Sequence, residues 1–128
     1  MDSLTTKGIQ IDVKALYEPE TSNPSSNKYV FSYHIEIFNR SKGPVQLIDR
    51  HWVIIDADNV RREVRGPGVI GLQPIIQPGE SHSYNSWSVL RTPLGKMEGR
   101  YGMIDILSQA PFKVEIPAFK LVADFVFN

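Results

Sequence analysis

A glycine-rich stretch near the middle of the chain holds the residues best suited to chemistry. Three glycines form a G-x-G-x-x-G pattern and three arginines precede them: Gly66, Gly68, Gly71, Arg61, Arg62 and Arg65. In dinucleotide-binding folds this pattern brings backbone N–H groups to a pyrophosphate at the start of a helix. Pro74 and Pro78 follow four residues apart and exclude such a helix, so the dinucleotide-binding fold is excluded as well.

Two interpretations of this stretch remain open. Consecutive amides around the glycines could bind an anion without a helix, next to arginines that give residues 60–71 an excess of two positive charges. Strand alternation would put Arg61 and Arg65 on one face and Arg62 on the other, so at most two of them converge. Alternatively, the glycines serve a crossover that needs unusual backbone angles, and the arginines are solvated.

Other candidates for chemistry are weaker. His34, His51 and His82 lack the close spacing that makes zinc sites recognisable, the chain has no cysteine, and a G-x-S-x-G nucleophile motif is absent. We therefore predict no catalytic residue, no metal and no cofactor. Trp87 stands among Ser and Asn residues, which favours either a packing role or an anchor for a protein partner.

Size and composition predict one globular domain over residues 1–128, with residues 1–7 flexible because they show no periodicity. Fourteen basic residues balance fourteen acidic ones, which argues against nucleic acid as a partner. No apolar run approaches the ~20 residues that span a bilayer, so we expect no membrane association. The absence of cysteine and of a signal-like N-terminus favours the cytoplasm.

Period-2 alternation of apolar side chains predicts the elements that must position these residues. About seven strands are expected, at residues 8–17, 28–39, 45–56, 60–64, 80–90, 99–107 and 112–127. Residues 61–87 form a long, rigid, positively flanked loop at one end in this interpretation. The pattern predicts an all-β, immunoglobulin-like or fibronectin type III-like sandwich, with a closed barrel as the alternative.

Three residues refine that prediction. Trp52 in the third strand and Tyr101, placed like a tyrosine corner, suit an immunoglobulin-like core, although either could be an ordinary core aromatic. Pro117 predicts a bend in the last strand, because an interior proline belongs at an edge or a bulge. That bent strand could also pair with a second copy and form a homodimer.

Several blocks of sequence resemble one family when read in order. They are Arg50-His51-Trp52, 66–74 (GPGVIGLQP), 78–80 (PGE), 90–93 (LRTP), 95–103 (GKMEGRYGM) and 112–119 (FKVEIPAF). Together they resemble the bacterial ApaG proteins over nearly the whole chain. Two departures are Trp87, where a glycine is more usual, and the turn at residues 107–111, which lacks an Asp-Gly pair.

The resemblance implies a fibronectin type III-like sandwich without an established enzymatic activity. Bacterial ApaG proteins are associated with cobalt and magnesium resistance and are often encoded beside a diadenosine tetraphosphatase. The same domain in eukaryotes is attached to F-box proteins and to a polymerase-interacting protein, where it resembles an interaction module. The family's glycine motif, matched here at Gly66, Gly68 and Gly71, has been likened to pyrophosphate-binding loops.

These observations lead to one main hypothesis and two alternatives. The main hypothesis is a non-enzymatic ApaG-type binding module in which the glycine-rich loop, its arginines and Trp87 contact an unidentified protein partner. The first alternative is a pyrophosphate or nucleotide binder linked to diadenosine polyphosphate metabolism, and therefore a phosphate-containing small molecule as partner. The second is an accessory factor in cobalt and magnesium homeostasis.

Overall fold

Alternating apolar and polar residues build nine antiparallel strands in this computed structural model, which describes residues 1–127 and the side chains of residues 1–125. Two short 3-10 turns complete the elements, η1 (Pro24–Ser26) and η2 (Asp124–Phe127). The strands are β1 (Asp2–Thr6), β2 (Ile9–Tyr17), β3 (Tyr29–Asn39), β4 (Val45–Asp56), β5 (Arg61–Pro67), β6 (Ile75–Ile76), β7 (Ser81–Leu90), β8 (Leu94–Asp105) and β9 (Pro111–Val122).

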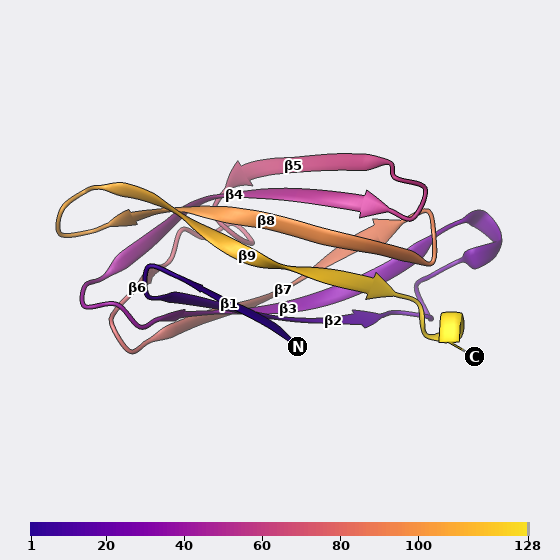
Figure 1. Cartoon of the computed structure of the whole chain (residues 1–128), viewed down its shortest axis with the longest axis horizontal. Helices are drawn as coiled ribbons and strands as arrows, with labels where there is room; N and C mark the ends of the chain where they lie inside the picture. The colour runs from indigo at the N-terminus through magenta and orange to yellow at the C-terminus, as the bar shows by residue number, and fades with distance from the viewer. Residues whose placement is uncertain (128) are drawn as a thin grey trace.

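The strands form two sheets that pack face to face (Figure 1). The first sheet has the order β1-β2-β3-β7, and the second has the order β5-β4-β8-β9 with the short β6 paired to β4. Within residues 1–127 no strand pairing joins the two sheets, so the closed barrel does not form. The predicted all-β, immunoglobulin-like or fibronectin type III-like sandwich is confirmed.

Inward-facing side chains of both sheets form one hydrophobic core, with Trp52 near its centre. The Trp52 ring packs edge-on against Tyr33 and Phe119, with ring centroids 5.5 Å and 6.0 Å away. Trp52 is therefore the core aromatic that the sequence predicted. Tyr101 is also buried, but its hydroxyl bonds to the hydroxyl of Tyr84 instead of to backbone, so the comparison with a tyrosine corner was wrong.

Four predicted strands agree with β2, β3, β4 and β7 to within one residue at each end. Three others differ in length. β5 continues to Pro67 and so includes the first glycine of the motif, β8 begins at Leu94 instead of residue 99, and β9 ends at Val122. Residues 61–87 are consequently mostly strand, and only 68–74 and 77–80 connect strands.

β1 was not predicted from the sequence, where residues 1–7 were expected to be flexible. Residues 2–6 instead pair with β2 in a continuous register from Asp2↔Val13 to Thr6↔Ile9. The Thr6 hydroxyl also accepts the amide N–H of Glu115 on β9, at 3.3 Å. Backbone pairing orders this segment, although most of its side chains are exposed and give no hydrophobic pattern.

Pro117 lies at a bulge between β8 and β9, as the bend predicted there requires. Met97 faces Phe119 and Gly99 faces Ile116, so the single residue between them on β8 opposes two residues on β9. β9 is also the outermost strand of its sheet, where a missing N–H is tolerated.

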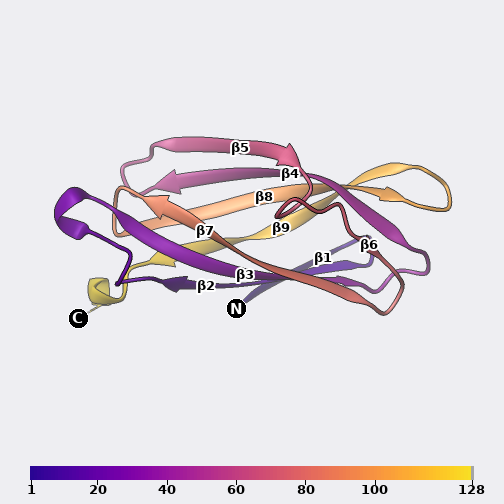
Figure 2. The same ribbon diagram turned by 180° about the vertical axis from the view of Figure 1, so that it is seen from behind.

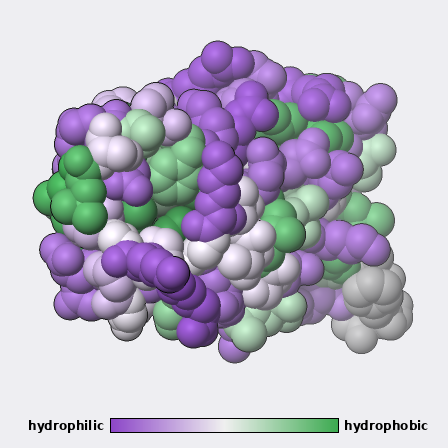
Figure 3. All heavy atoms as spheres, turned by 60° about the vertical axis from the view of Figure 1, so that its left-hand side comes forward, coloured by the Kyte–Doolittle hydropathy of each residue, from purple (hydrophilic) through white to green (hydrophobic). Residues whose placement is uncertain are grey.

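Hydrophilic side chains cover most of the surface seen in Figure 3, and hydrophobic ones form scattered groups. No helix within residues 1–127 has the length and apolar character needed to cross a bilayer.

Candidate functional site

The three arginines before the glycine motif lie on β5 and point in two directions. Residues 61–67 of β5 pair with residues 49–55 of β4, so alternate side chains face opposite sides of the second sheet. Arg65 lies over the outer face, where it shares a cavity with His51. Arg62 turns toward the first sheet and donates a hydrogen bond of 2.6 Å to the Val89 carbonyl. The three guanidinium groups therefore do not converge on one point.

The glycine motif forms a tight turn whose buried side chain is that of Val69, only 1% exposed. The amide of Leu72 donates to the Val69 carbonyl at 3.0 Å, and Ile70 and Gly71 between them have φ of +47° and +74°. Positive φ at both central positions is the signature of a type I′ turn. At Gly68, φ is +60° and a Cβ would lie 2.1 Å from the Leu72 carbonyl oxygen, so only glycine fits.

Most backbone amides of this loop already donate hydrogen bonds to other groups of the chain. Gly68 donates to the Ile48 carbonyl and Val69 to the Leu72 carbonyl, each at 2.8 Å. Gly66 is paired with Arg50 in the β4–β5 ladder. These bonds leave only the amides of Ile70 and Gly71 for a ligand, so the glycine spacing is explained by the turn and not by an anion-binding nest.

Arg50 holds the start of the loop from the neighbouring strand. Its Nη1 donates to the carbonyls of Pro67 at 3.0 Å and Gly68 at 3.1 Å. To reach them, the guanidinium passes over Gly66, where a Cβ would lie 2.9 Å from Nη1. Arg50 was not among the site residues predicted from the sequence. Its place directly opposite Gly66 depends on the β4–β5 register, which no local pattern specifies.

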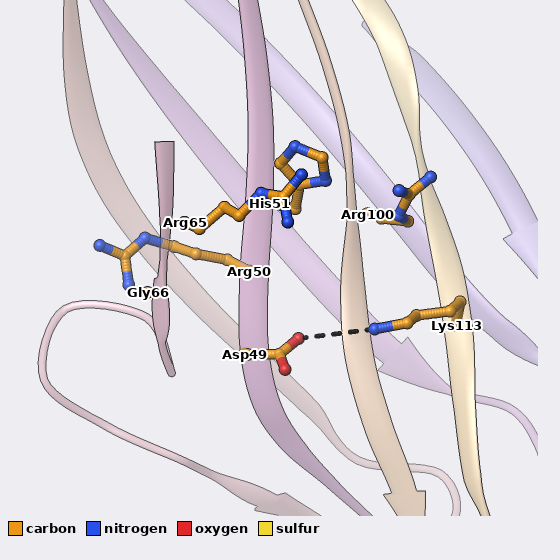
Figure 4. A pocket seen from close by; sticks show the side chains of 7 residues that line it. All are labelled: Asp49, Arg50, His51, Arg65, Gly66, Arg100 and Lys113. Carbon is orange, nitrogen blue, oxygen red and sulfur yellow. Dashed lines mark ion pairs between the residues drawn. The ribbon is translucent and has the colours of Figure 1, made fainter. Parts of the chain in front are cut away.

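A cavity of about 410 Å³ opens on the outer face of the second sheet, beside the start of the loop (Figure 4). Its lining residues come from all four main strands of that sheet: Asp49, Arg50, His51, Arg65, Gly66, Arg100 and Lys113. Four cationic side chains and one carboxylate give the lining an excess of three positive charges, in a chain whose formal net charge is zero.

Only some of these cationic side chains form ion pairs, so much of the positive charge is available to a ligand. Lys113 Nζ lies 4.0 Å from an oxygen of Asp49, and Arg65 lies 3.6 Å from Glu63 at the cavity edge. Arg50 and Arg100 have no carboxylate within 4.0 Å in the described part of the chain. In Figure 4 the Arg65 side chain reaches across β4 toward His51, while Arg50 points the opposite way, toward Gly66.

His51 connects this cavity to a second one. The adjoining cavity, of about 330 Å³, shares His51 and Arg100 and is also lined by Glu98 and Glu115. His51 Nε2 is buried and has no hydrogen-bond partner among the described residues, although Glu63 lies 3.8 Å away. An unpartnered buried nitrogen is costly, and a side-chain movement that brought a ligand oxygen to it would satisfy it.

Three buried tyrosines lie behind the cavity in the core. Burial raises the pKa of Tyr33, Tyr84 and Tyr101 above the usual phenol range. These phenols consequently stay neutral at physiological pH. Hydrogen bonding and packing, not proton transfer, are the roles that this chemistry supports.

The histidines lie on different elements. His34 is on β3, where its Nδ1 is 2.8 Å from the Asn85 side-chain oxygen, His51 is on β4, and His82 is on β7. Across residues 1–127 no group of three or more His, Asp or Glu side chains is arranged to hold a metal ion.

Trp87 does not belong to the surface that carries the arginine cavity. It lies on the outer face of β7 in the first sheet and is 61% exposed. Val89 on the same strand face and Leu16 on β2 are also exposed, and Leu16 and Trp87 are aligned with the same β3 residue, Ser32. The cavity faces outward from the other sheet. Residues 61–87 therefore supply two separate surfaces, contrary to the single contact region expected from the sequence.

Known proteins with similar sequences and structures cover nearly the whole chain. Residues 19–105 match the ApaG domain family. A protein from Anaeromyxobacter dehalogenans named Protein ApaG is 43% identical over all 128 residues, which is the full length of both chains. Protein ApaG of Escherichia coli is 43% identical over 111 residues, covering 87% of this chain and 88% of the relative.

Solved structures agree with this assignment. The crystal structure of a Bordetella pertussis protein named ApaA superimposes with a TM-score of 0.88 at 41% identity, covering 91% of this chain and 94% of the other. The C-terminal domain of Wzt, at 10% identity and a TM-score of 0.54 over 95% of this chain and 77% of the other, shares the fold alone. From the family match and the full-length relatives, the chain belongs to the ApaG family.

Proposed function

We propose that this protein is a binding module that recognises a phosphate-bearing ligand on the outer face of its second sheet. The observation that carries the proposal is the cavity of about 410 Å³ in which Arg50, Arg65, Arg100 and Lys113 outnumber the single carboxylate of Asp49. A cavity of this volume accommodates a small ligand. Its positive lining would attract an anion even though the whole chain is neutral.

The chemistry of the lining suits phosphate in particular. Guanidinium groups bind phosphate oxygens through two parallel hydrogen bonds, and Arg65 and Arg100 approach the cavity from strands on either side of β4. Arg50 is less available, because carbonyls of the loop already hold its guanidinium. We therefore assign the ligand contacts to Arg65, His51, Arg100 and Lys113.

Within this proposal the glycine motif has an indirect role. Gly66 leaves space for Arg50, and Gly68 and Gly71 form the turn that follows β5. The motif thereby sets the end of the strand that carries Arg65. Arg61 and Arg62, which the sequence grouped with Arg65, lie outside the cavity lining.

Binding is proposed in preference to catalysis because of the residues that line the cavity. No serine, threonine, tyrosine or cysteine is among them, so the cavity offers no hydroxyl or thiol nucleophile. Diadenosine tetraphosphate is one phosphate-bearing probe that follows from the family resemblance. An indirect role in cobalt and magnesium homeostasis and a cytoplasmic location stay predictions that no geometric feature favours.

An NMR titration tests the proposal directly. Isotope-labelled protein is titrated at low salt with pyrophosphate, ATP and diadenosine tetraphosphate in turn. We expect saturable shifts at the amides of His51, Arg65, Arg100 and Lys113. Replacing both Arg65 and Arg100 by Gln should weaken the affinity at least tenfold, about 1.4 kcal/mol.

The control is Arg61→Gln, which removes one positive charge from β5 outside the cavity lining and is compared with Arg65→Gln, which removes one from the same strand inside it. Its affinity should stay within about twofold of the wild type. Equal losses in both variants would indicate nonspecific charge attraction. The absence of saturable shifts with all three probes would overturn the proposal.

A further inference from the structure

Apart from the two-residue β6, the two sheets end in four edge strands, and of these four only β7 lacks the features that discourage strand pairing. β1 is short and carries Asp2, and β5 carries four charged side chains within seven residues. β9 carries charges, two prolines and the bulge at Pro117. β7 has the sequence SHSYNSWSVL, without Lys, Arg, Asp, Glu or Pro, and pairs with β3 in an uninterrupted register. Charge, proline and bulges are the usual protections of an edge strand.

The unprotected edge of β7 presents backbone groups outward. The amide of Asn39 on β3 donates to the Glu80 carbonyl at 3.0 Å, which sets the phase of the β3–β7 ladder. N–H and C=O groups alternate in direction along a strand, so those of the odd-numbered residues 81–89 point away from β3. Among these groups only the Val89 carbonyl has a partner in the described part of the chain, the side chain of Arg62.

We propose that β7 pairs with β7 of a second copy, antiparallel and around a two-fold axis at Asn85. This strand lies toward the viewer in Figure 2, and its sheet has no further strand beyond it. Two-fold pairing at Asn85 places Trp87 opposite Ser83 and Val89 opposite Ser81. Each large outward side chain then meets a small one, so the strand is complementary to itself in size.

Charge complementarity supports the same register. A two-fold axis at Asn85 places Leu90 opposite Glu80 of the other copy. Arg62 lies beside that end of β7, at the Val89 carbonyl, and has no carboxylate within 4.0 Å among the described residues. Glu80, whose carboxylate accepts only the Gln77 amide, likewise has no cation at that distance. The pairing therefore brings Arg62 of each copy close to Glu80 of the other copy, which gives two equivalent contacts.

The same comparison disfavours the other edges. The last strand was one possible pairing edge from its sequence, but in β9 the bulge interrupts the register and Lys113, Glu115 and Lys120 add charge. A two-fold pairing of β5 around Glu63 would oppose Glu63 to itself and Arg61 to Arg65. Like charges directly opposite one another destabilise a strand pair.

The resulting contact is small. Of the five facing residue pairs in this register, the central three exchange about six main-chain hydrogen bonds, and at each end the Val89 carbonyl is already bonded to Arg62. A single strand pair buries an area at the low end of the range for stable interfaces. We therefore expect a weak dimer, with association measurable at protein concentrations of roughly 0.1–1 mM.

Sedimentation equilibrium of the full chain over that concentration range tests the proposal. The wild type should associate to a dimer. Asn85→Pro removes the N–H at the axis, and should weaken association at least tenfold while the fold survives, because that N–H does not bond to β3. Asn85→Thr, which also loses the side-chain contact to His34 but keeps the N–H, should associate like the wild type.

Exchanging the charges of Arg62 and Glu80 tests the proposed β7–β7 register without introducing a proline. Arg62→Glu and Glu80→Arg should each weaken association at least tenfold, and the double variant should recover most of the loss. A wild type that stays monomeric at every concentration overturns the proposal. The candidate partner of the β7 edge would then be a different protein. Dimerisation of Asn85→Pro with wild-type affinity, or double-variant affinity no better than the singles, would overturn this pairing as well.

Discussion

The guanidinium of Arg50 lies directly over Gly66, so close that a Cβ built on the glycine would sit 2.9 Å from Nη1. This relationship connects a strand of the second sheet to the loop that follows β5, because Nη1 bonds to the carbonyls of Pro67 and Gly68. The glycine is needed for space here and not for an unusual φ, since its backbone is extended within β5.

Gly66→Ala should therefore act through Arg50. The added methyl displaces the end of a flexible side chain, and loss of its two hydrogen bonds should cost about 1–3 kcal/mol of unfolding free energy. Urea unfolding measures the change. In an Arg50→Ala background the same glycine substitution should cost much less, and an equal cost in both backgrounds would contradict the coupling.

Gly68 and Gly71 should respond very differently to alanine. At Gly68 the new Cβ would meet the Leu72 carbonyl and the φ is positive, so Gly68→Ala should cost about 2–5 kcal/mol. At Gly71 the surrounding space is open and only the positive φ opposes a side chain, so Gly71→Ala should cost about 1–2 kcal/mol. Equal losses in urea unfolding would show that space at Gly68 is not limiting.

Ile70 is a β-branched residue at φ +47°, and it is 62% exposed. Asn tolerates this conformation better and would create the Asn-Gly pair that type I′ turns prefer. Ile70→Asn should therefore raise the unfolding free energy by about 1 kcal/mol, seen as a higher urea midpoint. Leu72→Asn is the control, because Leu72 is similarly exposed without a positive φ. A gain in both variants would mean that replacing an exposed apolar side chain by a polar one, and not the turn conformation, is responsible.

The hydroxyls of Tyr84 and Tyr101 bond to each other inside the core. Tyr84→Phe or Tyr101→Phe leaves one buried hydroxyl without its partner and should cost about 1–3 kcal/mol. The double variant should cost less than the sum of the singles, because neither hydroxyl then remains unpaired. Strictly additive losses would mean that the bond contributes nothing.

The same tyrosines predict a loss of stability in alkali. Their pKa values are raised in the folded protein, chiefly by burial. Their contribution is complete below the unfolded phenol pKa of about 10 and is lost above it, because only the unfolded chain then releases the protons. The expected slope is roughly 1.4 kcal/mol per pH unit for each phenol. Urea unfolding between pH 8 and 11 should show a smaller slope in the Tyr84→Phe/Tyr101→Phe variant.

Much of the fold follows from local alternation of side chains. Ile9, Ile11 and Val13 face the core while Gln10 and Asp12 do not, so β2 could be predicted from its own residues. β1 could not, because its sequence DSLTT has one large apolar residue and the strand depends on pairing with β2. The start of β8 was missed because Met97 was the only buried residue among Leu94–Glu98.

The candidate site was less predictable because it depends on which strands are neighbours. Arg65 was selected from its position beside the glycines, and it does line the cavity. Arg100 and Lys113 come from β8 and β9, and they reach the same cavity only through the order β5-β4-β8-β9. Trp87 shows the opposite case. It was grouped with the arginines because it is close to them in sequence, but it lies on the other sheet.

The hydrogen bond between Thr6 and Glu115 joins residues that are 109 positions apart. β9 pairs with β8 and also packs on β1 and β2, so the first and last strands meet. Contacts this distant along the chain close large loops, and proteins dominated by them fold slowly, in milliseconds to seconds. A ribosome must release the final strand before this sandwich can close, and until then β1 and β2 of the first sheet lack the strand that packs on them.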